Sequence, residues 1–142
     1  MSEERFKGLI TQGWLVMLLW SAVTLTSFFQ PSILDANTAR FINVSLLTAF
    51  TLIHGSVRYG GGIFVYFVIA VLVTNVFENM SISTGFPFGA YEHTAAMGPK
   101  VWHVPIIVGP IFAVAGYIAW MIAGILLGDV FSQPRGVTYA RP

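Results

Sequence analysis

The sequence lacks cysteine and contains very little charge. The absence of cysteine excludes disulfides, thiol nucleophiles, iron–sulfur clusters and thiolate zinc sites. Only 9% of the 142 residues are Asp, Glu, Lys or Arg, and 56% are hydrophobic, whereas a soluble domain is about a quarter charged. Such a chain cannot cover its surface with polar groups in water. The net charge is +1 and the charges are scattered, so no basic patch for nucleic acid is present.

Four runs without charged residues are candidates for membrane spans, each of which needs about 20 residues. They are Leu9–Phe29, Phe41–Val57, Gly60–Phe77 and Val104–Leu127. The sequence therefore predicts an all-α integral membrane protein. It would be a single domain with four transmembrane helices, a long non-helical loop between the third and fourth, no sheet, and a polar tail over residues 128–142.

The basic residues predict the orientation, because cytoplasmic loops carry an excess of Lys and Arg. With four spans, both termini lie on one side. That side would carry five basic residues against two on the other: Arg5, Lys7, Arg58, Arg135 and Arg141 against Arg40 and Lys100. We therefore expect both termini in the cytoplasm and the chain in the cell inner membrane.

Polar residues follow one face of the second predicted span. They recur every three or four residues, at Ser45, Thr48, Thr51, His54 and Arg58. Ser and Thr serve close helix packing in lipid, while a histidine at membrane depth needs a partner or a function. His54 is therefore a candidate substrate-binding residue, with a structural role as the alternative. We expect this face to point into the bundle, within reach of Thr74 or Glu78.

A second polar group ends the third predicted span and includes Thr74, Asn75, Glu78 and Asn79. An ionisable residue at the edge of an apolar run is a functional hypothesis by default. Burial would favour the neutral carboxyl group, which is the form a general acid needs. The alternative is that Glu78 lies solvated among the lipid headgroups.

The link over residues 80–103 is long for a helical bundle and holds the most unusual residues. Its segment Gly85–Gly89 alternates two glycines and a proline with Phe86 and Phe88. Glycine and proline interrupt a helix, and the two phenylalanines are too apolar for a solvated loop. We therefore expect a compact, non-helical loop folded back on the membrane.

Titratable and aromatic residues flank this loop. Tyr91, Glu92 and His93 follow it, and Trp102 and His103 precede the fourth predicted span. Together with the carboxyl group at the end of the third span they predict an acid–base site beside an apolar pocket. An interfacial aromatic belt is the alternative for the Trp and Tyr residues. No spacing matches a helical zinc motif, so no metal or other cofactor is predicted.

A family resemblance is carried by the string ENMSISTGFPFGAYEHT, followed by GPK and a VPI start to the next helix. This pattern resembles the carotenoid biosynthesis membrane-protein family over about residues 40–128. Its best-known members are the carotenoid 1,2-hydratases of the bacterioruberin and gamma-carotene pathways. The resemblance implies a cofactor-independent hydratase acting on an end group of a C40 or C50 polyene. The matching positions are Glu78, Gly85, Pro87, Phe88, Gly89 and Tyr91.

The first functional hypothesis is hydration of an isoprenoid double bond. Glu78 or Glu92 would be the acid, and Tyr91 and His93 would orient water. The substrate would be held by a set of residues in and beside the loop: Phe86, Phe88, Gly85, Gly89, His54 and Asn79.

The second hypothesis is a non-catalytic subunit that packs against partner membrane chains and holds a carotenoid or lipid. Family members are usually longer and carry a second polar motif with aspartates, which is missing before Pro142. This departure fits a short form, a fragment, or a scaffold that has lost the chemistry. A transporter fragment is a third interpretation, for which the sequence offers neither an inverted repeat nor a charged pathway.

Overall fold

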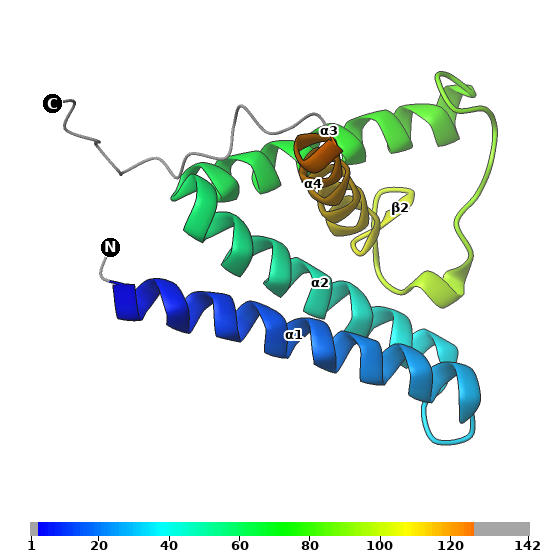
Figure 1. Cartoon of the computed structure of the whole chain (residues 1–142). Coiled ribbons are helices and arrows are strands. Elements are labelled where there is room, and N and C mark those ends of the chain that lie inside the picture. Colours follow the sequence, from blue (N-terminus) through cyan, green and yellow to red (C-terminus); the bar gives the residue numbers. More distant parts are fainter. Residues whose placement is uncertain (1–2, 127–142) are drawn as a thin grey trace, which may run out of the picture.

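The computed structural model describes residues 3–126, and four helices make up most of them (Figure 1). The helices are α1 (Glu3–Phe29), α2 (Ala36–Tyr59), α3 (Gly62–Thr84) and α4 (Val108–Leu126). By length and composition α1, α2 and α3 can each cross a membrane, and α4 is a shorter apolar helix. Three such helices indicate an integral membrane protein. The predicted polar tail over residues 128–142 lies outside the described residues.

The helices are arranged as a hairpin followed by an open V. α1 and α2 lie side by side, and α2 and α3 diverge from a tight turn, with α4 between them (Figure 1). Asp35 begins α2 by accepting hydrogen bonds from the backbone N–H groups of Asn37 and Thr38, both at 3.0 Å. Such a cap satisfies backbone donors that the first helical turn leaves unpaired.

The turn between α2 and α3 is made by Gly60 and Gly61, and Gly62 is the first residue of α3. Gly60 has φ +59°, a backbone conformation that residues with a Cβ atom rarely adopt. Close packing follows directly after the turn, where Gly55 of α2 faces the buried side chain of Ile63 on α3. The absence of a side chain at Gly55 lets the two helices approach.

Helix α3 is longer than the predicted span, which ends at Phe77. It continues to Thr84, so Glu78 lies inside the helix and not at its end. The polar side chains in these turns are satisfied within the helix, because they donate to the carbonyl oxygens four residues earlier. Asn79 donates to Asn75 O at 2.8 Å, and Thr84 donates to Met80 O at 2.7 Å.

The segment Gly85–Gly89 is non-helical, as predicted. Gly85 ends α3 in the left-handed conformation (φ +78°), and its N–H donates to Ser81 O at 2.8 Å. The hydroxyl oxygen of Ser81 then accepts a hydrogen bond from Phe88 N at 2.7 Å. These two bonds fold the loop back onto the last turns of α3.

The prediction of an entirely helical fold without a sheet is wrong at one place. Strands β1 (Lys100–Val101) and β2 (Val104–Pro105) form a two-stranded antiparallel pair, preceded by the short 3-10 helix η1 (Ala95–Met97). The apolar residues after His103 are therefore not the start of the fourth helix, which begins at Val108. Val104, Ile107 and Val108 are instead buried in a core cluster that bridges α2 and α3 through Val44 and Ile82.

Packing at the α2–α3 turn gives a testable prediction. A Cβ atom at Gly55 would lie 2.5 Å from Cγ1 of Ile63, whereas nothing lies within 4 Å of one added at Gly61. We expect Gly55→Ala to lower the free energy of unfolding by about 1–3 kcal/mol, the usual cost of overpacking. Gly61→Ala is the control and should change it little. Thermal unfolding in detergent, followed by circular dichroism, measures both, and equal midpoints would contradict the packing.

Candidate functional site

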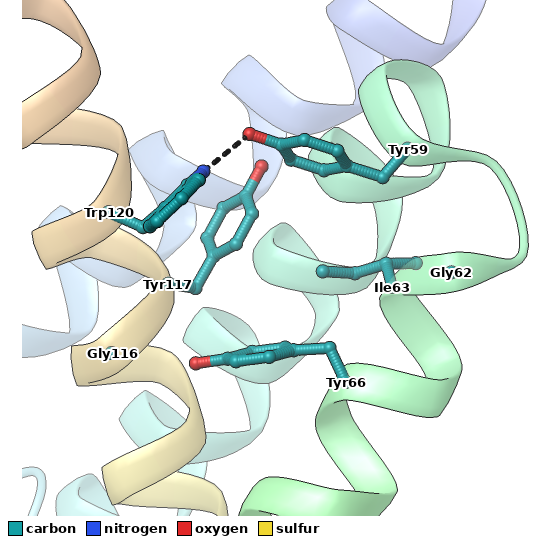
Figure 2. Close-up of a pocket in the computed structure, with 7 residues that line it drawn as sticks. All are labelled: Tyr59, Gly62, Ile63, Tyr66, Gly116, Tyr117 and Trp120. Carbon is teal, nitrogen blue, oxygen red and sulfur yellow. Dashed lines mark hydrogen bonds between the residues drawn. The ribbon is translucent and has the colours of Figure 1, made fainter. Parts of the chain in front are cut away.

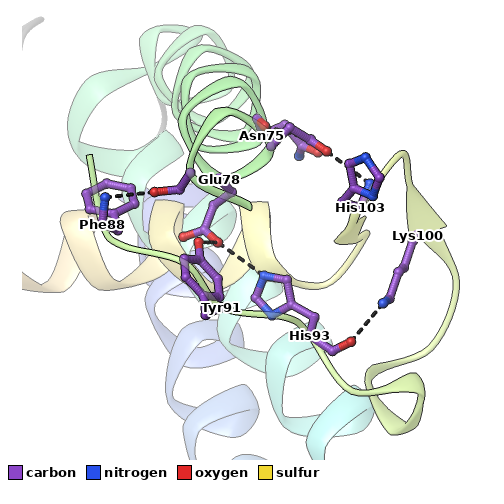
Figure 3. A network of polar contacts seen from close by, with 9 residues as sticks. Asn75, Glu78, Phe88, Tyr91, His93, Lys100 and His103 are labelled. Carbon is purple, nitrogen blue, oxygen red and sulfur yellow. Dashed lines mark hydrogen bonds and ion pairs between the residues drawn. The ribbon is translucent and has the colours of Figure 1, made fainter. Parts of the chain in front are cut away.

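The buried carboxyl group of Glu78 is the centre of a polar cluster beside the last two turns of α3 (Figure 3). Its Oε2 atom accepts a hydrogen bond from the hydroxyl of Tyr91. The Nε2 atom of His93 lies 3.1 Å from the same oxygen. Glu78 is only 5% exposed, and a buried carboxyl group without such partners would cost several kcal/mol. The cluster therefore satisfies Glu78 through one of its two oxygens.

The loop after α3 brings the two partners to Glu78. Residues 91–94 have no regular secondary structure, and Tyr91 and His93 both point toward α3 (Figure 3). Glu92, between them, is exposed. Side chains two residues apart share a side in an extended chain, which accounts for this alternation. The structure thus brings Tyr91 and His93 to Glu78 and leaves Glu92 outside the cluster.

The phenol of Tyr91 is strongly perturbed by this environment. Burial, followed by the hydrogen bond to Glu78 and by its charge, raises the pKa of Tyr91 to about 12. Tyr91 therefore keeps its proton through the physiological range and acts as a hydrogen-bond donor to the carboxyl group. Lys100 supports the same segment from outside, because its Nζ atom donates to the backbone oxygen of His93 at 2.7 Å.

Asn79 holds the strand pair against α3. Its Oδ1 atom accepts a hydrogen bond from His103 N at 3.0 Å, while its Nδ2 atom donates to Asn75 O. Asn79 is buried, 7% exposed. This predicted substrate-binding residue therefore fixes the β1–β2 turn beside the cluster, and its amide is occupied by backbone groups.

The loop residues predicted to hold substrate lie on the outside of the bundle. Phe86 and Phe88 are both exposed, at 66% and 60%. Gly85 and Gly89 have φ values of +78° and +96° and shape the turn that carries the two rings. The loop thus presents two exposed aromatic side chains, and Tyr91, which binds the buried carboxyl group, follows it in the chain.

His54 lies away from the cluster, on the face of α2 toward α4. Its Nδ1 atom is 2.6 Å from the hydroxyl of Tyr117 on α4. Thr51, one turn away, is completely buried, whereas Ser45 is exposed and donates to the carbonyl oxygen of Phe41. The polar face of α2 therefore points into the bundle only in part, and the partner of its histidine is Tyr117.

The cluster has the parts of an acid–base site. It combines a buried carboxyl group, a phenol that stays protonated and an imidazole within hydrogen-bond reach, which are the usual participants in general acid–base catalysis. Among residues 3–126, three or more His, Asp or Glu side chains do not gather in a group that could hold a metal ion.

Comparison with known proteins identifies the family. The sequence profile of the carotenoid biosynthesis protein family matches residues 41–139, which is well over half of the chain. The chain belongs to this family. Comparisons with curated proteins and with solved structures give no match. The matched region of this carotenoid biosynthesis protein includes the whole Glu78 cluster and all of α4.

Sequence reasoning missed two features of this family member. Tyr117 was not singled out because it lies in an otherwise apolar run, 63 residues after its partner His54. The role of Asn79 in binding a backbone N–H group required the position of the strand pair. The recurrence of aromatic residues near the end of α2 and in α4 is the sequence signal that could have pointed to Tyr117. The sequence contains no signal for the role of Asn79.

The environment of Tyr91 predicts its titration. Because burial is the largest cause of its raised pKa, Glu78→Gln should lower the Tyr91 pKa from about 12 only part of the way to the ordinary 10.0. The measurement is the tyrosinate absorbance of the detergent-solubilised chain minus that of its Tyr91→Phe variant, with the helical content followed by circular dichroism. A Tyr91 pKa of 10 in the unaltered chain would contradict the cluster.

Proposed function

We propose that this carotenoid biosynthesis protein is a cofactor-independent hydratase, which adds water to a double bond in the isoprenoid end group of a polyene. The observation that carries this proposal is the buried carboxyl group of Glu78, bonded by Tyr91 and His93 through a single oxygen. Membership in the family supplies the substrate class. The proposal assigns no role to a metal or cofactor.

Glu78 is the acid in this proposal. In the acid form that we propose for catalysis, the proton is on Oε1, because Oε2 accepts the hydrogen bonds from Tyr91 and His93. The π electrons of the double bond take this proton at the less substituted carbon, which leaves a tertiary carbocation and a carboxylate. The hydrogen bonds from Tyr91 and His93 stabilise the negative charge that develops on the carboxylate.

His93 positions the water molecule. When its Nε2 atom carries the proton and donates to Glu78, its Nδ1 atom is a hydrogen-bond acceptor. A water held there adds through its oxygen to the carbocation, and the surplus proton returns to the Glu78 carboxylate. In the overall reaction one alkene and one water molecule give one tertiary alcohol, and the Glu78 carboxyl group is regenerated.

The exposed rings of Phe86 and Phe88 give the polyene a place to approach from the bilayer. An aromatic face attracts a cation through its quadrupole, an effect of about 0.5–2 kcal/mol, and these rings stand at the loop that carries Tyr91. We assign them to the end group and its carbocation. In this proposal the two exposed rings, and not an apolar pocket as the sequence predicts, contact the end group of the polyene.

The alternative is a non-catalytic subunit of a larger membrane complex that packs against partner chains and holds a carotenoid or lipid. It is favoured by the long apolar faces of α3, on which Val65, Val68 and Leu72 are all more than half exposed. Lipid covers such faces equally well, so we rank this function second.

Two amide substitutions test the proposed acid. Glu78→Gln keeps the shape of the side chain but cannot supply a proton, so turnover of an acyclic carotenoid in isolated membranes should fall about a hundred- to ten-thousand-fold. Glu92→Gln is the matched control, and because Glu92 is exposed outside the cluster this variant should keep most of its turnover. The hydrated product is quantified by mass spectrometry, with folding checked by circular dichroism.

Either of two results would count against the hydratase. Full turnover in Glu78→Gln would remove Glu78 as the acid. An inactive unaltered chain, tested alone and with the membrane proteins that copurify with it, would favour the subunit function instead.

A further inference from the structure

A hollow lies at the opposite end of α3 from the Glu78 cluster, where the end of α2, the start of α3 and α4 meet (Figure 2). Its volume is about 570 Å³, within the range of about 300–1,000 Å³ that is typical of small-molecule sites. Tyr66 and Glu78 are twelve residues apart on α3, or about 18 Å of helix. The hollow is therefore separate from the Glu78 cluster. It is lined by Tyr59, Gly62, Ile63, Tyr66, Gly116, Tyr117 and Trp120.

The aromatic walls of this cavity are fixed by hydrogen bonds to other helices. Tyr66 donates to the backbone oxygen of Ala113 at 2.8 Å, and the indole N–H of Trp120 donates to the hydroxyl of Tyr59 at 3.0 Å. The Tyr117 hydroxyl is held by His54 of α2, outside the cavity. Walls that are ordered beforehand lower the entropic cost of binding.

Gly116 makes room for one of these walls. A Cβ atom at this position would lie 2.6 Å from the hydroxyl oxygen of Tyr66, so the absence of a side chain at Gly116 lets that hydroxyl group lie where it does against α4. The Tyr66 side chain points from α3 toward Gly116 in Figure 2. The Tyr66 side chain therefore forms a wall of the cavity by approaching Gly116 closely.

The polar groups of the cavity define the chemistry of its ligand. The Tyr59 hydroxyl accepts a hydrogen bond from Trp120 and retains its own hydrogen as a donor, so it suits an acceptor oxygen on the ligand. The four aromatic rings suit a flat conjugated body.

The charged groups near the cavity and its opening toward lipid further restrict the class of ligand. The described lining residues include no carboxylate, and the Arg58 guanidinium lies 5.8 Å from the Tyr59 ring, which disfavours a cationic ligand. Trp120 is 55% exposed, so the cavity is open toward the outside of the bundle, where lipid would lie. A ligand dissolved in the bilayer can therefore reach it from the side.

We propose that this aromatic cavity binds a flat conjugated ketone from the bilayer, of the quinone class, with its carbonyl oxygen accepting a hydrogen bond from Tyr59 and its ring between Tyr66, Tyr117 and Trp120. This is a binding site distinct from the proposed hydratase centre. No step of the proposed hydration passes through it.

Quenching of Trp120 fluorescence tests the site, because a bound quinone would lie against this indole. The probe is decylubiquinone, added to the full chain in detergent with Trp14, Trp20 and Trp102 replaced by Phe. We expect saturable quenching. A Cβ atom at either Gly61 or Gly62 meets nothing within 4 Å, and only Gly62 lines the cavity. Gly62→Leu should therefore abolish the saturable phase, while Gly61→Leu should retain it.

A second variant tests the hydrogen bond without adding volume. Tyr59→Phe should raise the half-saturating concentration of decylubiquinone about tenfold, the effect of one lost hydrogen bond. Three results would overturn the proposal. The first is equal, non-saturating quenching in both leucine variants, because it would show that the quinone only partitions into the micelle. The others are an unchanged affinity in Tyr59→Phe and displacement of the quinone by tetramethylammonium, which would identify a cation site. Each readout is independent of hydratase turnover.

Discussion

A carboxyl group buried within an apolar helix is the constraint on which the rest of this structure depends. Glu78 cannot remain there without partners, because an uncompensated buried charge or donor costs several kcal/mol. Its own helix supplies none of the hydrogen bonds that it makes. The loop Gly85–Gly89 turns the chain back, so that Tyr91 and His93 reach the carboxyl group. The same loop places the aromatic rings of Phe86 and Phe88 on the outside of the bundle.

The two ends of α3 differ in chemistry. At one end, Glu78 and Asn79 are held by a loop and by a strand pair; at the other, aromatic side chains enclose a cavity beside the glycine turn. α4 joins these ends because Gly109 packs against Val71 and Asn75, whereas Gly116 packs against Tyr66. A larger residue at either position would require its neighbours on α3 to shift.

Much of this arrangement could be predicted from the sequence. Long apolar runs and helix-breaking residues are local signals, so the three long helices, apart from the last turns of α3, and the non-helical Gly85–Gly89 segment could be predicted from them. The candidates Glu78, Tyr91 and His93 were visible as titratable residues around one apolar loop. The strand pair was not, because two-residue strands have no periodicity and Val104 continues the apolar run of the next helix. The contact between His54 and Tyr117 depends on how α2 and α4 cross, which no local pattern encodes.

The most direct test of proton transfer to the polyene is an assay of the unaltered chain in deuterium oxide. If an acid protonates the alkene before water adds, as the Glu78 cluster requires, the alcohol should carry one deuterium on the carbon next to the carbinol carbon. Deuterium is located by nuclear magnetic resonance and counted by mass spectrometry. A hydroxylated product without deuterium at that carbon would contradict the account, because its oxygen would then have been introduced by a different reaction.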